Sequence, residues 1–292
     1  MFTKKMKKAT AFICAAFVGA AGLTGCSNTS SSSDGETIKI GFVNWAECVA
    51  VSNIWENILE EQGYEVELTQ LDVAPLFVGM SQGSVDIFLD AWLPTTHSNY
   101  WEQYEGDLYD AGVWYEESAK LGIVVPSYVT IDSLEDFNGV ADQFDNEIIG
   151  IEPGAGMMKT TAQVLEDYGM DDTTLVQGSE AAMLAALSKA YEKNEWIAVT
   201  GWSPHWMFAS YDLKYLEDPK GNFGSAEQLH TLLNDDFAQA NPEVTAMLER
   251  FSMGDQEIGS VEKLINDGMD PSDAAKQWIE DNQDLVDSWI GE

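Results

Sequence analysis

Short apolar runs alternate with longer amphipathic stretches along most of the chain. Ile38, Ile40 and Phe42 occupy every second position, as in a half-buried strand. The stretch 51–59 places its apolar side chains on one helical face, and Gly63 follows as a stop signal. The same order of strand and helix then recurs. Further strands are predicted at 66–68, 85–89, 148–151, 175–176 and 197–200, and helices at 73–81, within 154–168 and at 183–191.

This alternation predicts an α/β fold with mainly parallel sheets. It occurs twice, on either side of a less regular middle at 112–145, and the chain becomes helical again from about residue 241. The pattern therefore predicts two α/β lobes with a cleft between them. Lobe 1 is predicted to contain residues 37–122 plus 229–292, and lobe 2 residues 123–228.

The first residues read as an export signal. Four lysines among the first eight residues precede an apolar run, Ala9–Leu23, which is shorter than the about 20 residues that span a bilayer. The run ends in Leu23-Thr24-Gly25-Cys26, which resembles the bacterial lipobox, where a peptidase cuts before a cysteine that is then acylated. We therefore expect a signal peptide at 1–25, a lipid on Cys26 and a serine-rich tether at 26–36. The alternative is an ordinary signal peptide with a chance cysteine.

Composition excludes several functions. The formal net charge is −36 with a single arginine, so the basic clusters that bind nucleic acid are missing. The 45% of hydrophobic residues argues against a disordered acidic chain. Once Cys14 leaves with the signal and Cys26 is acylated, Cys48 remains alone, so neither an internal disulfide nor a cysteine-based metal site is expected. Cys48 itself is expected to be a small buried residue at a helix start.

Three tryptophans follow three predicted strands. Trp45 comes after the first strand, Trp92 after the third and Trp202 after the strand at 197–200. Ligands of open α/β sheets bind at the carboxyl ends of strands, where these rings would converge. Indole faces attract cations, and quaternary ammonium ions are their best-known cargo. Packing in the core is the alternative for each ring taken singly.

The segment Ile151–Met158 is a glycine-containing loop that leads into a predicted helix. Free amides at a helix start bind anions, and without a basic cluster or a GxGxxG pattern a small carboxylate is a better guess than a nucleotide. His97 lies five residues after Trp92, where we expect it at the cleft rim, whereas His205 and His230 are expected to be structural. No HExxH or GxSxG motif is present, which disfavours enzyme functions.

At these segments the chain resembles the glycine betaine/proline betaine substrate-binding proteins of ABC importers. The resemblance covers nearly all of the chain after the signal and is carried by the segments 41–47, 89–97, 150–158, 179–187, 200–208 and 211–219. It implies a two-lobed periplasmic-binding-protein fold with a hinged cleft. It also implies a tryptophan prism around a trimethylammonium group, formed by Trp45, Trp92 and Trp202. The carboxylate is then held by the amides of Gly156 and Met157 and by His97. Cys48 departs from the family pattern.

These features together predict a non-enzymatic lipoprotein outside the cytoplasm, without cofactor or metal. Its expected role is to bind glycine betaine or proline betaine and to deliver it to an ABC permease with its ATPase, for osmoprotection. Three alternatives stay open: choline or carnitine as the ligand, a secreted enzyme acting on methylated amines, and a sensor or adhesin with the same fold.

Overall fold

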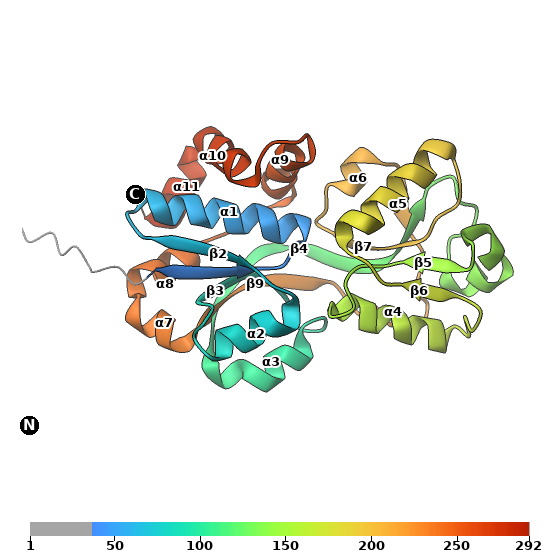
Figure 1. Cartoon of the computed structure of the whole chain (residues 1–292), viewed down its shortest axis with the longest axis horizontal. Coiled ribbons are helices and arrows are strands. Elements are labelled where there is room, and N and C mark those ends of the chain that lie inside the picture. The colour runs from blue at the N-terminus through green and yellow to red at the C-terminus, as the bar shows by residue number, and fades with distance from the viewer. Residues whose placement is uncertain (1–36, 292) are drawn as a thin grey trace, which may run out of the picture. The chain divides into compact units, whose positions relative to one another are not determined.

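Nine strands in the described part of the chain, residues 37–291 of a computed structural model, form one hydrogen-bonded sheet, in which eight strands follow one continuous path and β8 (Leu213–Tyr215) pairs beside it with β4 (Leu108–Pro126) (Figure 1). The predicted signal peptide, the tether and Cys26 lie outside the described residues. The path has two ends, and the strands fall into a group near each end. The first group contains β2 (Val66–Gln70), β1 (Ile38–Phe42), β3 (Ile87–Leu93), β9 (Glu227–Asn234) and the first half of β4 (Leu108–Pro126). The second group contains the rest of β4 with β7 (Val199–Ser203), β8 (Leu213–Tyr215), β5 (Glu147–Ile149) and β6 (Thr174–Val176).

The outer strands are parallel and the middle strands are antiparallel. β1 pairs in parallel with β2 and β3, and β5 pairs in parallel with β6 and β7. β9 is antiparallel to β3 and β4, and β4 is antiparallel to β7. The prediction of mainly parallel sheets is therefore correct for the outer strands and wrong for the middle. The difference arises because the chain crosses between the groups along β4 and returns along β9.

Strand β4 connects the two groups and was not recognised in the sequence. It pairs with β9 as far as Ala119 and with β7 from Lys120 onward, so its partner changes within one strand. Several register shifts interrupt its pairing with β9, one of them beside Gly112, which has a φ of 110°. A bulged strand that changes sheets does not show the regular alternation on which a strand prediction relies.

Helices cover both faces of the first group. α1 (Ala46–Glu61) lies over one face, and α9 (Asp255–Asn266), α10 (Pro271–Asp281) and α11 (Gln283–Ile290) lie over α1, while α2 (Val73–Ser81) and α3 (Ser98–Tyr104) lie on the opposite side (Figure 1). The second group carries α4 (Gly156–Asp167), α5 (Glu180–Lys193) and α6 (Met207–Ser210). The remaining elements are α7 (Asp235–Ala240), α8 (Pro242–Leu248) and short 3-10 turns at Glu105–Asp107, Leu134–Gly139 and Ala141–Phe144.

Helix α1 is buried on more sides than its apolar face predicts. Ser52, Asn53 and Asn57 are buried together with the apolar stripe, because α9 and α10 cover the polar side of the helix. Asn57 donates to the carbonyl oxygen of Asn53 at 2.7 Å, which satisfies part of its amide inside the protein. The ring of Trp55 stacks on that of Trp289 with 6.2 Å between centroids. This packing holds α1 rigidly, and its first residues form part of the site described below.

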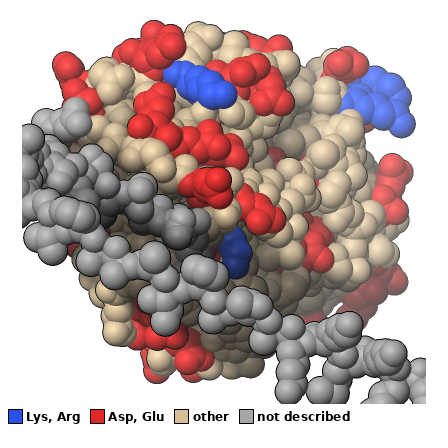
Figure 2. Space-filling view, turned by 60° about the vertical axis from the view of Figure 1, so that its left-hand side comes forward, with Lys and Arg blue, Asp and Glu red and all other residues tan. Residues whose placement is uncertain are grey.

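The surface is strongly acidic. Figure 2 shows Asp and Glu side chains spread over one face with few Lys or Arg between them, as the 50 acidic and 14 basic residues of the chain require. Among the described helices, none has the length and the apolar character that crossing a bilayer needs.

Candidate functional site

A cavity lies where the first and the second strand group meet. The space between its atoms amounts to about 280 Å³ when the solvent at its mouth is included. The first group contributes residues from the end of β1, from β3 and from the loop after it, and the second contributes the start of α4 and residues of β7. Its lining residues are Trp45, Glu47, Trp92, Thr96, His97, Leu121, Ile151, Ala155, Gly156, Met157 and Trp202. All six residues that the sequence assigned to a ligand therefore line one cavity.

The three tryptophans reach the cavity from strand ends, but not all as predicted. Trp45 follows β1 and is the N-cap of α1. Trp92 and Trp202 were expected just after their strands, but β3 continues to Leu93 and β7 to Ser203. Each of these tryptophans is therefore the next-to-last residue of its strand. The strands are longer because each pairs with an antiparallel neighbour as far as its last residue, β3 with β9 and β7 with β4. All three rings are at most 5% exposed.

Each of these indole rings is held by a carboxylate. Trp45 Nε1 donates to Glu152 Oε1 at 2.7 Å, and Trp202 Nε1 donates to Glu47 Oε2 at 2.9 Å. Trp92 Nε1 donates to Asp90 Oδ1 at 3.1 Å. With their only N–H groups used in this way, the rings can offer a ligand nothing but their faces and edges.

His97 is a buried hydrogen-bond donor without a partner. It was expected at the cleft rim, but its side chain is fully buried, because Trp45 stacks on it with 5.8 Å between ring centroids and Phe77 packs edge-on. Its Nδ1 accepts the backbone N–H of Trp92 at 3.0 Å. Burial lowers the pKa of His97 to about 3, so the ring is neutral and carries its proton on Nε2. That Nε2 has no hydrogen-bond partner among the described residues.

Two further free donors come from the start of α4. Ala155, the N-cap, provides no side-chain hydrogen bond, and the backbone N–H groups of Gly156 and Met157 reach no acceptor in the described part of the chain. The positive end of the helix dipole adds to the attraction for an anion at this place. Together with His97 Nε2, the cavity thus presents three donors to an acceptor that the protein does not supply.

Gly156 also allows the two strand groups to approach. A Cβ atom at this position would lie 2.4 Å from the carbonyl oxygen of Thr96, on the loop that follows β3. Since the obstructing atom belongs to the backbone, it cannot turn aside as a side chain would. Glycine is therefore required here by close contact.

Sequence reasoning missed the carboxyl groups around the cavity. Glu47 and Asp90 are buried, and each keeps one oxygen without a partner in the described part of the chain. Burial, reinforced by neighbouring Glu180, raises the pKa of Glu47 to about 8. Burial followed by the nearby charge of Glu47 raises that of Asp90 well above its usual range. Glu47 and Asp90 stand within the segments that carry the family resemblance, but among 50 acidic residues nothing marks them.

Glu180, at the start of α5, joins the second group to the first. One of its oxygens accepts the N–H of Ala46 at 3.1 Å, at the otherwise uncapped start of α1. Its other oxygen faces His205 Nε2 at 3.2 Å. His205 Nδ1 accepts from Met207 and burial lowers the pKa of His205 to about 4, so this contact is a hydrogen bond from a neutral ring. Burial raises the pKa of Glu180 to about 8.

The remaining candidates are structural, as expected. His230 pairs with Asp110 at 2.9 Å, away from the cavity lining. Cys48 is a buried free thiol in the first turn of α1, and burial raises its pKa well above the usual range, which argues against a reactive thiolate. No group of potential metal ligands occurs among residues 37–291.

A larger groove, about 1670 Å³ with the solvent at its mouth, runs between α9 and residues 203–210. The larger groove is lined by carboxylates as well as apolar groups, whereas the smaller cavity combines aromatic faces with unpaired donors. The smaller cavity therefore has the features of a site for a compact ligand.

The fold defines a mixed α/β, periplasmic-binding-protein-like architecture. The chain belongs to the family described as the substrate-binding domain of ABC-type glycine betaine transport systems, whose model matches residues 36–281. This finding agrees with the resemblance that the sequence motifs indicated.

Individual relatives support the assignment. A glycine betaine/carnitine transport binding protein of Listeria monocytogenes is 40% identical over 152 residues, which are 51% of this chain and 51% of the relative, so the chain matches about half of the relative's length. Lactococcal OpuAC, solved in a closed conformation with glycine betaine, is 38% identical with a TM-score of 0.82, over 87% of this chain and 99% of that one. A choline-binding protein solved with choline is 27% identical with a TM-score of 0.81, over 87% and 91%.

Gly156→Ala is expected to prevent the close contact with Thr96 and to weaken ligand binding at least about tenfold, since the free amides of α4 are displaced. Isothermal calorimetry with glycine betaine, the ligand of the lactococcal structure, measures the effect. Gly154→Ala is the matched control, because a Cβ there meets only Val73 at 3.9 Å. Equal affinity of the two variants would contradict the steric argument.

Thermal stability is expected to fall as the pH rises from 6.5 to about 8. In this window the folded protein retains protons on Glu47 and Glu180, with pKa values of about 8, which the unfolded chain has already released. His97 and His205, whose folded pKa values lie below the usual 6.5, act in the opposite direction only below about pH 6.5.

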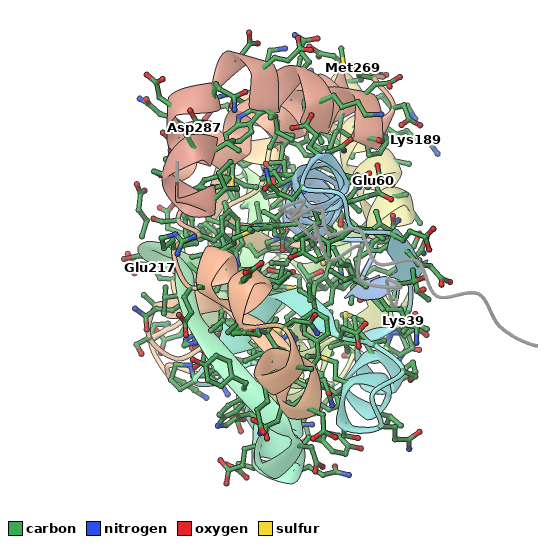
Figure 3. All side chains as sticks on the ribbon, turned by 90° about the vertical axis from the view of Figure 1, so that its left-hand side faces the viewer. Lys39, Glu60, Lys189, Glu217, Met269 and Asp287 are labelled. Atoms are coloured by element: carbon green, nitrogen blue, oxygen red, sulfur yellow. The ribbon has the colours of Figure 1, made fainter. Side chains whose placement is uncertain are left out.

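Glu180→Gln cannot titrate and should flatten this pH dependence, measured as Tm by circular dichroism without ligand. The exposed Glu60→Gln on the outer side of α1 (Figure 3) is the control and should keep the wild-type slope. A slope unchanged by Glu180→Gln would show that Glu180 is ionised throughout.

Proposed function

We propose that this protein captures a small zwitterion with a quaternary ammonium group, glycine betaine in the first place and proline betaine as a close relative, and delivers it to an ABC importer. The observation that carries the proposal is the composition of one cavity. Three aromatic faces and three unpaired hydrogen-bond donors line the same small space. The similarity to proteins with glycine betaine in their names supports the proposal independently of the cavity.

The aromatic faces suit the ammonium end of such a ligand. A trimethylammonium group has no N–H to donate, so a cage of polar acceptors offers it little. Its spread positive charge is attracted by the faces of Trp45, Trp92 and Trp202, each contact being worth about 2 kcal/mol when desolvated.

The free donors suit the carboxylate end. His97 Nε2 and the amides of Gly156 and Met157 are unpaired, and a buried donor without an acceptor costs about 1–3 kcal/mol. A carboxylate accepts all three in charge-assisted hydrogen bonds, which are stronger than neutral ones. These donors come from both strand groups, so one carboxylate would join them.

Binding is proposed to close two lobes. Residues 37–122 plus 229–292 would form lobe 1 and residues 123–228 lobe 2, connected by β4 and by the chain entering β9. Because the ligand touches both lobes, it favours the closed state over the open one, and the closed state is the form that an ABC permease with its ATPase would recognise. The lobe boundaries stay a prediction.

Choline is a second candidate, favoured by one observation. Glu47 Oε1 lines the cavity without a hydrogen-bond partner and could accept the hydroxyl group of choline. The likeness to a choline-binding protein points the same way. Choline, however, leaves the three donors without a carboxylate, which is why glycine betaine ranks first.

Export and a lipid anchor complete the proposal. They rest on the charged start, the apolar run and the Leu23–Cys26 motif, which lie outside the described residues. A tether at 26–36 would let the binding domain reach its permease while the lipid on Cys26 holds it at the outer side of the cell membrane.

Glycine betaine is expected to bind at least about tenfold tighter than choline, since roughly 1.4 kcal/mol corresponds to a factor of ten. A calorimetric panel of glycine betaine, proline betaine, carnitine, choline and proline measures this ranking. His97→Ala should weaken glycine betaine more than choline, whereas Trp92→Ala should weaken every trimethylammonium ligand. Choline binding as tightly as glycine betaine would make the choline function the better one, and no binding of either would refute the proposal.

Cys26→Ala should release the protein from the membrane fraction, because the acylated residue is lost. Fractionation followed by mass spectrometry of the wild-type amino terminus tests this. An unacylated wild type that fractionates like the variant would instead indicate an ordinary signal peptide.

A further inference from the structure

The three tryptophans that form the proposed aromatic cage, Trp45, Trp92 and Trp202, have hydrogen-bond acceptors of a different kind from those of every other tryptophan. All ten tryptophans lie in the described part of the chain, and only Trp45, Trp92 and Trp202 donate to carboxylates. Elsewhere, Trp278 donates to the hydroxyl of Ser260, and Trp289 has an unpaired N–H. The carboxylate acceptors are thus confined to the cavity.

Two of the three bonds cross from one strand group to the other, in opposite directions. Trp45 at the start of α1 donates to Glu152, which follows β5 in the second group. Trp202 in β7 donates to Glu47, which lies in the first turn of α1. Only the bond from Trp92 to Asp90 stays within one strand, β3. The first two rings are therefore held from the opposite side of the cavity.

We propose that Glu47 and Glu152 are positioning residues, each of which binds the indole N–H of a tryptophan on the opposite lobe. The complete aromatic cage of Trp45, Trp92 and Trp202 then exists only when the lobes are closed. The inference rests on the proposed quaternary-ammonium function and deepens it. Opening would break both bonds and free the two indoles to turn about their broad terminal torsions. A cage assembled by closure keeps the captured ligand in place.

Glu47 and Glu152 also link closure of the lobes to the positive charge of the ligand. Closing removes water from Glu47, which is 1% exposed, and from part of Glu152, and burial raises the pKa of both. Without a ligand the buried Glu47 therefore keeps its proton, and its ionised form is favoured only beside a positive charge. A quaternary ammonium ion between the rings supplies that charge, whereas a neutral molecule of equal size does not.

Glu152 allows a clean test, because it touches Trp45 but does not line the cavity. Its effect on the ligand is therefore expected to act through the ring of Trp45, and the double-mutant cycle below tests this. Glu152→Ala should raise the dissociation rate constant of glycine betaine about tenfold and change the association rate constant much less, since the bond forms only after closure. Stopped-flow tryptophan fluorescence measures both constants. Glu152→Gln, which keeps an acceptor oxygen without the charge, should give an intermediate rate.

A double-mutant cycle distinguishes positioning of the Trp45 ring by Glu152 from a general disturbance of the protein structure. Trp45→Phe retains an aromatic face but has no N–H, so adding Glu152→Ala to it should cost nothing further. Ser260→Ala, which removes the acceptor of Trp278 outside the cavity, is the control and should leave both rate constants unchanged. If Glu152→Ala keeps the wild-type dissociation rate constant, or if the effects of Glu152→Ala and Trp45→Phe are additive, the inference is wrong while the proposed function still stands. A wild type that binds no quaternary ammonium ligand overturns the proposed function, and the inference with it.

Discussion

Water leaves the space between the two strand groups when they meet, and every polar group that stays behind must find a partner. Most do so within the protein: the indole N–H groups bind carboxylates, and Glu180 binds the start of α1. His97 Nε2, Glu47 Oε1 and the first amides of α4 do not. The unpaired groups are of two kinds: hydrogen-bond donors that suit an anion, and a carboxyl group that lies beside aromatic faces. One small zwitterion would provide a partner for each kind. The selectivity and the closure proposed here both derive from that deficit.

Two helix starts at the cavity illustrate how the same physical feature serves different ends. The first amide of α1 is occupied by Glu180 from the other strand group, which makes it a link between the groups. The first amides of α4 are left free and face the cavity, where Gly156 lies against the backbone of Thr96. A helix start is a potential anion site in either case. Whether the acceptor belongs to the protein or to a ligand depends on which side chain the fold brings there.

Much of the fold was predictable from local pattern. Strand β1, helix α2 and the end of α1 at Gly63 follow from residues close together in the sequence. The long strand β4 was not predictable, because its regularity depends on two different partners. The ends of β3 and β7 were placed too early for the same reason, and His97 was placed at a rim because its burial depends on rings contributed by α1 and α2.

The sequence by itself indicated the α/β class, the family and six residues that line one cavity, since tryptophans near strand ends, a glycine-containing helix start and the family motifs are local signals. Only the tertiary structure decided which carboxylates matter. Glu47, Asp90, Glu152 and Glu180 are indistinguishable from the other acidic residues until the fold buries them beside particular donors. The physical reason is that Glu47, Glu152 and Glu180 each have a hydrogen-bond partner more than one hundred positions away in the sequence, and such contacts leave no periodic trace in the chain.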